Sequence, residues 1–120
     1  MLVDDEPGIV RAYQLALEDA GFTVSIARDG AAALEAVRLN RPDAVVVDLL
    51  MPAMNGWQFM EALRELPGEP CPVIAMTAAG PGAVRAARSA GQFSAVLEKP
   101  VQLDDLLGLL AVLVGGSGQN

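Results

Sequence analysis

Short apolar runs alternate with longer stretches of helical periodicity along the whole chain. The apolar runs predict five β-strands, at 1–3, 23–27, 44–47, 72–76 and 95–97. In the stretches that follow each run, apolar residues recur every three or four positions, which is the spacing of one helix face. These stretches predict five helices, at 7–20, 31–39, 57–66, 83–90 and 103–114. The predicted elements therefore alternate strictly between strand and helix.

This alternation indicates an α/β fold, in which helices connect parallel strands. The run Ala44–Val47 is apolar at every position, so both of its faces are expected to be buried. Such a sheet needs helices on each side, which predicts a doubly wound five-stranded parallel sheet with five helices. The 120 residues leave room for one domain, placed at 1–114, and the Gly/Ser-rich end at 115–120 is predicted to be a flexible tail.

Composition and charge exclude several classes of function. The net charge of −7 disfavours direct binding to nucleic acid. The chain has no histidine, which excludes histidine-based zinc sites, Ser-His triads and a histidine that carries phosphate. Cys71 is the single cysteine and has no partner for an internal disulfide. Neither a signal peptide nor a membrane-spanning apolar run is visible, so the sequence predicts a cytoplasmic domain that does not enter a membrane.

Polar residues with chemical potential stand directly after the predicted strands. Asp4 and Asp5 follow the first strand, Asp48 the third, Thr77 the fourth and Lys99, the only lysine, the fifth. The carboxyl ends of parallel strands meet at one edge, where open α/β sheets bind ligands. Three carboxylates there repel one another unless a cation compensates, and carboxylate oxygens favour a hard ion such as Mg²⁺. The residues alone therefore suggest a Mg²⁺-dependent site at which an aspartate attacks phosphorus.

At these residues the sequence resembles the receiver domain of two-component response regulators. The most specific segments are Val47–Gly56, Ala75–Ala78 and Glu98–Pro100, and the resemblance covers nearly the whole chain. It implies a flavodoxin-like fold with the strand order 2-1-3-4-5. It also implies a phosphorylation-dependent signalling switch that catalyses only its own phosphorylation and dephosphorylation. The phosphodonor would be the phosphohistidine of a sensor histidine kinase or a histidine phosphotransfer protein.

The resemblance assigns a role to each residue at the strand ends. Asp48 is expected to be the phosphoacceptor and to bind the Mg²⁺ ion together with Asp5 and the carbonyl oxygen of Leu50. Asp4 is expected to hold a water bound to the metal.

Two further residues complete the expected site. Thr77 is the expected switch hydroxyl, and Lys99 the expected cation that binds the phosphoryl group. The Lys99–Pro100 peptide is expected to be cis.

The expected output face departs from the family pattern. The family usually has an aromatic residue three positions before the lysine, and this chain has Val96 there. The output is still expected through the fourth helix, fifth strand and fifth helix. In the last helix we predict a core face and, on the outer side, Leu109 and Val112. These two residues are either scattered surface hydrophobes or a surface for a partner or a second copy. The predicted core face consists of Leu103, Leu107, Leu110 and Val114.

Three other functions remain as alternatives. A phosphatase of the haloacid-dehalogenase type needs a second acid two residues after its nucleophile, where this chain has Leu50. A phosphorylation-independent interaction module usually loses an acidic residue or the lysine, whereas all of these groups are present here. A flavodoxin-like FMN binder shares the fold, but carboxylates stand where the phosphate of FMN would bind.

Overall fold

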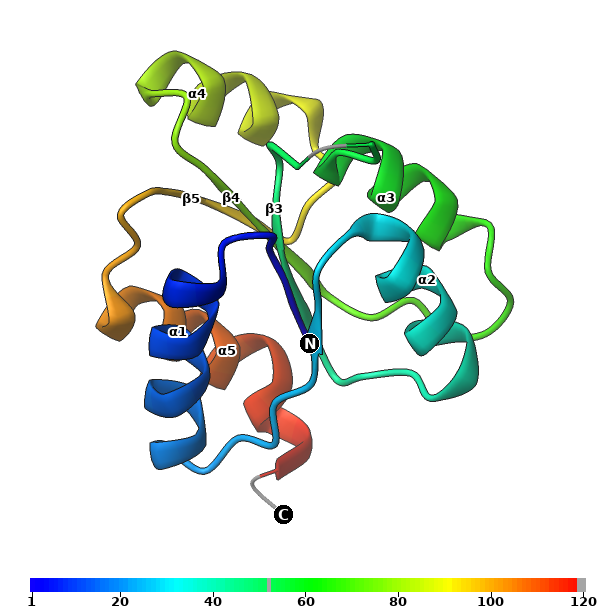
Figure 1. Cartoon of the computed structure of the whole chain (residues 1–120), viewed down its shortest axis with the longest axis vertical. Helices are drawn as coiled ribbons and strands as arrows, with labels where there is room; N and C mark the ends of the chain where they lie inside the picture. The colour runs from blue at the N-terminus through cyan, green and yellow to red at the C-terminus, as the bar shows by residue number, and fades with distance from the viewer. Residues whose placement is uncertain (52, 119–120) are drawn as a thin grey trace.

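The computed structural model describes residues 1–51 and 53–118, with backbone alone for the last four. Five parallel strands form a single sheet in the order β2-β1-β3-β4-β5, which confirms the expected flavodoxin-like topology (Figure 1). The strands are β1 (Leu2–Val3), β2 (Ile26–Ala27), β3 (Val45–Asp48), β4 (Val73–Thr77) and β5 (Ala95–Glu98).

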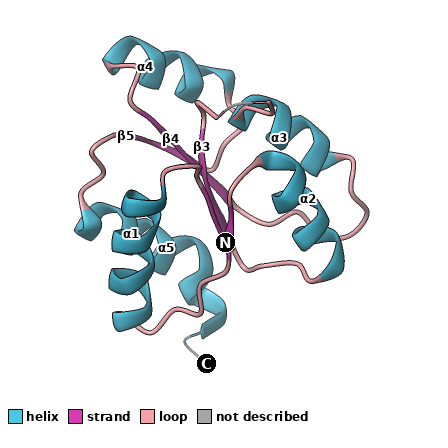
Figure 2. Ribbon diagram, in the orientation of Figure 1, coloured by secondary structure: helices cyan, strands magenta, loops and turns pink. Residues whose placement is uncertain are grey.

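Helices cover both faces of this sheet. They are α1 (Pro7–Asp19), α2 (Gly30–Leu39), α3 (Gly56–Arg64), α4 (Pro81–Ala90) and α5 (Leu103–Gly118). Figure 2 shows α1 and α5 together on one side of the strands, with α2 and α3 on the other. The helix α4 lies on the same sheet face as α2 and α3. It packs against β5 through Val84 and Ala87.

The core has two sides because the central strands are buried on both faces. In β3, Val45 and Val47 pack in the cluster under α2 and α3, whereas Val46 packs with residues of α1 and α5. All five residues of β4 are buried. The apolar runs thus reflect a central position in the sheet, as predicted.

Every element except β2 and α5 begins and ends within two residues of its predicted bounds. The strand β2 contains only Ile26–Ala27 instead of 23–27, because its one neighbour, β1, offers only Leu2–Val3 for pairing. The helix α3 begins at Gly56 and ends at Arg64, two residues before the predicted end at Leu66.

The buried face of α5 differs from the predicted one. Among the side chains of α5 that the structure describes, Leu106 and Leu110 are buried. Leu110 confirms its predicted core position, but the centre of the buried face is rotated by about 50°, at 100° per residue, from the predicted line. Leu109 is half-buried and packs against the core, so its predicted outer position is wrong. Val112 is 79% exposed, as predicted.

The helix α5 also continues beyond Val114 to Gly118. The predicted tail at 115–120 therefore shares its first residues with this helix, because helical hydrogen bonds need only the backbone that glycine also provides. Residues 119–120 lie outside the described residues. In the described part of the chain, none of the helices has the length and apolar character required to span a membrane.

Candidate functional site

The polar residues that were predicted to lie at the carboxyl edge of the sheet are found there. Asp48 and Thr77 are the last residues of β3 and β4, Asp4 follows β1, and Lys99 follows β5. Among the described residues, the buried polar side chains are Asp4, Asp48 and Thr77, with 2%, 4% and 1% of their surface exposed. Burying carboxylates is costly unless they are paired and hydrogen-bonded. Their environment must therefore compensate them.

Lys99 supplies that compensation. Its Nζ donates to Asp48 Oδ2 at 2.8 Å and to Asp4 Oδ2 at 3.0 Å, and it lies 3.7 Å from Glu6 Oε1. Burial alone would lower the pKa of Lys99, but the hydrogen bonds and the charges of Asp48 and Asp4 outweigh that effect. The pKa of Lys99 is therefore raised above its ordinary value, and the ammonium stays charged throughout the physiological range.

The backbone fixes the second oxygen of each buried carboxylate. The N–H of Leu50 donates to Asp48 Oδ1 at 3.0 Å, and the N–H of Glu6 donates to Asp4 Oδ1 at 3.1 Å. Thr77 Oγ1 accepts from the N–H of Ala79 at 3.1 Å. That contact uses an acceptor lone pair of the hydroxyl and leaves its donor capacity for another group.

The loop between β3 and α3 is closely packed against Asp48. A Cβ on Gly56 would lie 2.9 Å from the carbonyl oxygen of Asp48, so only glycine fits there. Asn55 and Gln58 form a capping box, in which each side chain accepts from the other residue's N–H at 2.9 Å. The Asn-Gly pair of the sequence therefore serves to begin α3 directly against the backbone of Asp48.

An acidic cluster at this edge has the donor set of a hard divalent cation. One carboxylate oxygen from each of Asp4, Glu6 and Asp48 lies within 4.8 Å of the others. Oxygen ligands of this kind suit Mg²⁺. Sequence reasoning missed Glu6, although the run Asp4-Asp5-Glu6 was visible as three consecutive acids. Asp5 is exposed and its carboxylate is not part of the cluster.

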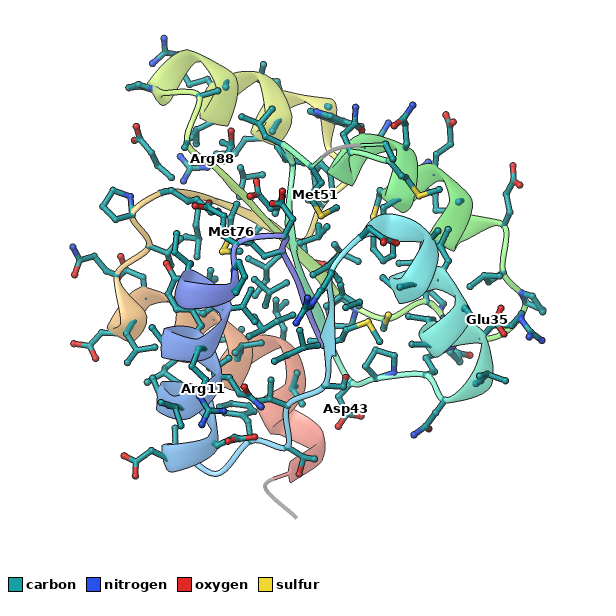
Figure 3. The ribbon with its side chains drawn as sticks, in the orientation of Figure 1. Arg11, Glu35, Asp43, Met51, Met76 and Arg88 are labelled. Atoms are coloured by element: carbon teal, nitrogen blue, oxygen red, sulfur yellow. The ribbon has the colours of Figure 1, made fainter. Side chains whose placement is uncertain are left out.

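Leu50, the Lys99–Pro100 peptide and Val96 are the other positions that the sequence singled out. Leu50 is 59% exposed beside Asp48, with its N–H bonded to that carboxylate. The Lys99–Pro100 peptide is cis, as expected. Val96 is buried in β5, and its carbonyl oxygen accepts a 2.9 Å hydrogen bond from Arg88 Nη2 of α4. Met51 and Met76, labelled in Figure 3, are buried apolar residues near the same edge.

The fold and this edge together define a doubly wound α/β domain with an acidic pocket at the carboxyl ends of its strands. The model of the response regulator receiver domain family matches residues 1–111. The chain belongs to this family. Receiver domains bind Mg²⁺ at an acidic pocket, and response regulators of two-component systems partner with sensor histidine kinases.

Known response regulators and receiver domains are similar to this chain in sequence and in structure. The response regulator MprA of Mycobacterium sp. (strain KMS) is 32% identical over 95% of this chain. That match covers 49% of the relative, so the chain spans about half its length. The Francisella response regulator 1452 receiver domain is 25% identical, with a TM-score of 0.86 and coverage of 97% of this chain and 95% of that one.

A third similar structure contains a metal. It is the receiver domain of the sensor histidine kinase PA1611 from Pseudomonas aeruginosa PAO1, with a magnesium ion coordinated in its active site cleft. It is 26% identical, has a TM-score of 0.83, and the alignment covers 95% of this chain and 94% of that one.

Proposed function

We propose that this domain is a phosphorylation-dependent switch in which Asp48 accepts a phosphoryl group from a partner's phosphohistidine. The observation that carries the proposal is the pairing of the only lysine with a buried aspartate at the end of β3, at 2.8 Å. An oxygen of Asp48 forms a bond to phosphorus while the bond from phosphorus to the donor's imidazole nitrogen breaks. The donor is a sensor histidine kinase or a histidine phosphotransfer protein.

The Mg²⁺ ion would be held directly by Asp5, Asp48 and the carbonyl oxygen of Leu50. Asp4 would hold it through a water. The bound ion supplies positive charge that offsets the repulsion between carboxylates and phosphoryl oxygens. Asp5 is exposed, so its side chain is able to turn toward Asp4 and Asp48. Glu6 already lies beside them and competes with Asp5 for this role.

A Mg²⁺ titration distinguishes Asp5 from Glu6 as the metal ligand. Fluorescence of Trp57 is a suitable signal, because Trp57 is the second residue of α3 and stacks edge-to-face on Phe93 with ring centroids 5.1 Å apart. We expect Asp5→Asn to weaken Mg²⁺ binding strongly and Glu6→Gln to weaken it less. Unchanged binding by the Asp5→Asn protein would contradict the assignment of Asp5, and a larger effect of Glu6→Gln would transfer the role to Glu6.

After transfer, two side chains bind the phosphoryl group. Lys99 exchanges its bonds to Asp4 and Asp48 for bonds to phosphoryl oxygens. The hydroxyl of Thr77 donates to another of these oxygens, because its present contact uses only its acceptor capacity. The movement of Thr77 alters the β4–α4 loop and, through it, partner binding by the face formed by α4, β5 and α5.

The domain would have no other enzymatic activity and would act in the cytoplasm. Direct nucleic-acid binding is not expected at a net charge of −7. A second copy is a possible partner through α5, where Val112 is 79% exposed.

Labelling with a small phosphodonor tests the proposed function. In the presence of Mg²⁺, acetyl phosphate is expected to label the protein with one base-labile phosphoryl group. The Asp48→Asn variant is the matched test, because it keeps the size of the side chain and removes its nucleophilic charge. Stoichiometric labelling of that variant would place the acceptor elsewhere, and an unlabelled wild-type protein would favour the phosphorylation-independent interaction module.

A further inference from the structure

A cavity of about 180 Å³ adjoins the carboxylate cluster. It lies between the first turns of α1 and the end of β2, and Asp4 belongs both to its lining and to the cluster. Its volume is roughly six times the ~30 Å³ that one water occupies in the liquid. The cavity therefore has room for a group of several heavy atoms next to the proposed phosphoacceptor site.

Two arginines line this cavity. Arg11 projects from α1, where Figure 3 labels it, and Arg28 follows β2. Within the described part of the chain, Arg11 has one side-chain hydrogen bond, a long contact of 3.4 Å from Nη1 to Gln14 Oε1. Among the described residues, Arg28 forms neither an ion pair nor a side-chain hydrogen bond. Both guanidinium groups therefore keep donors for a ligand.

The lining combines two arginines with two aspartates, Asp4 and Asp5, and Asp4 is already paired with Lys99. Guanidinium groups bind a planar carboxylate with two parallel hydrogen bonds. Val10 and Ile26 add apolar surface to the same cavity, which suits a short hydrocarbon group attached to the carboxylate. Asp5 also lines the cavity and would repel an anion, but in the proposed function its charge is offset by the Mg²⁺ ion.

We infer that Arg11 and Arg28 form a subsite for the carboxylate leaving group of small acyl phosphates, an inference that rests on the proposed function. In the reaction with acetyl phosphate, an oxygen of Asp48 forms the bond to phosphorus. The bond between phosphorus and the acetyl oxygen breaks, and acetate leaves with the electron pair. No proton is transferred. Negative charge grows on the acetate oxygens during this step, which is where the two guanidinium groups stabilise it.

A comparison of two phosphodonors tests the subsite. Acetyl phosphate releases acetate, whereas phosphoramidate releases ammonia and has no carboxylate. The quantity to compare is the labelling rate with acetyl phosphate divided by that with phosphoramidate. We expect Arg28→Gln to lower this ratio about threefold, as for exposed charge-assisted contacts. The double variant Arg11→Gln/Arg28→Gln is expected to lower it about tenfold, for the same reason. Arg64→Gln is the matched control, since Arg64 is an exposed arginine of α3 on the other face of the sheet.

Acetate provides an independent measurement. Sodium acetate is expected to slow labelling of the wild-type protein by acetyl phosphate more than sodium chloride of the same ionic strength, and to lose this effect in the double variant. An equal loss with both donors, or an equal loss in Arg64→Gln, would overturn the subsite and leave a general charge effect. If neither donor labels the wild-type protein, the proposed function itself fails, which is a different result.

Discussion

The loops that follow β3 and β4 leave the same edge of the sheet but differ in how firmly they are held. After β3, the two ends of the loop are held by the Leu50–Asp48 hydrogen bond, by the capping box of Asn55 and by the close approach of Gly56 to the backbone of Asp48. After β4, the residue that precedes α4 is Gly80, which has a φ of 96° and provides no side-chain cap for the helix. A Cβ on Gly80 would meet no atom within 4 Å.

This difference fits a division of labour within the site. In the proposed function, the acceptor carboxylate must keep one geometry, because phosphoryl transfer depends on alignment. The segment proposed to respond must change conformation at low cost, which a loosely packed loop allows. Arg88 and the buried Val84 and Ala87 still attach α4 to the sheet. We therefore expect the adjustable part to be the β4–α4 loop, which follows Thr77, and the first turn of α4.

The largest effect is expected when Lys99, the cation that holds Asp48 at the end of β3, is replaced. Lys99→Met leaves Asp4 and Asp48 buried without their partner, which costs about 3 kcal/mol of unfolding free energy at neutral pH. Chemical denaturation measures it. The loss should shrink in Lys99→Met/Asp4→Asn, which also removes one of the two unpaired buried charges. A loss of the same size in both variants would contradict this electrostatic origin.

In the wild-type protein, high pH should remove the charge of Lys99 and with it the stabilisation that Lys99 provides. Folding raises the pKa of Lys99, so the stabilisation is present in full below the unfolded-state value of about 10.4. It is lost as the pH rises beyond that value through the folded-state pKa. Stability that falls with pH above about 10 in the wild type, but not in Lys99→Met, would establish this linkage.

Two glycine substitutions compare the loops directly. A Cβ on Gly56 would lie 2.8 to 2.9 Å from atoms of Asp48 and Leu49, so Gly56→Ala is expected to cost about 2 to 3 kcal/mol. At Gly82, in the first turn of α4, a Cβ meets nothing within 4 Å, and alanine favours the helix by up to about 1 kcal/mol. Thermal unfolding of both variants measures the difference. Equal effects would contradict the proposed contrast between a held and a loose loop.

The sequence was sufficient for the sheet and for most of the edge. Asp48, Thr77 and Lys99 could be placed together because carboxyl ends of parallel strands meet, whatever the details of packing. Glu6 was missed, since its position beside Asp4 depends on how the chain turns from β1 into α1. The buried face of α5 was predicted with an error of about half a residue step, because the segment 106–114 contains no charged residue to mark the solvent side. The extent of β2 depends on pairing with β1, which its own sequence does not reveal.

The response of the β4–α4 loop can be measured by hydrogen exchange. With Mg²⁺ and beryllofluoride, a mimic of the phosphoryl group, we expect the amides of 78–90 to gain protection as Thr77 moves and the loop and α4 pack more firmly. Amides of 55–60, which already lie in the capped start of α3, should change less. Protection confined to the Asp48 loop, with 78–90 unchanged, would show that the signal does not pass through α4.

The smallest effect on folding is expected at the outer surface of α5. Val112 is 79% exposed, so Val112→Glu should change the unfolding free energy by less than about 0.5 kcal/mol. Leu109 is half-buried against the core, and Leu109→Glu should cost more, about 1 to 2 kcal/mol, because a carboxylate would then be partly desolvated. If α5 mediates self-association, Val112→Glu should weaken dimerisation in sedimentation experiments while phosphorylation of Asp48 continues at the wild-type rate. Unchanged association by the folded Val112→Glu protein would leave this residue as an isolated surface hydrophobe and place any output on α4 and β5 instead.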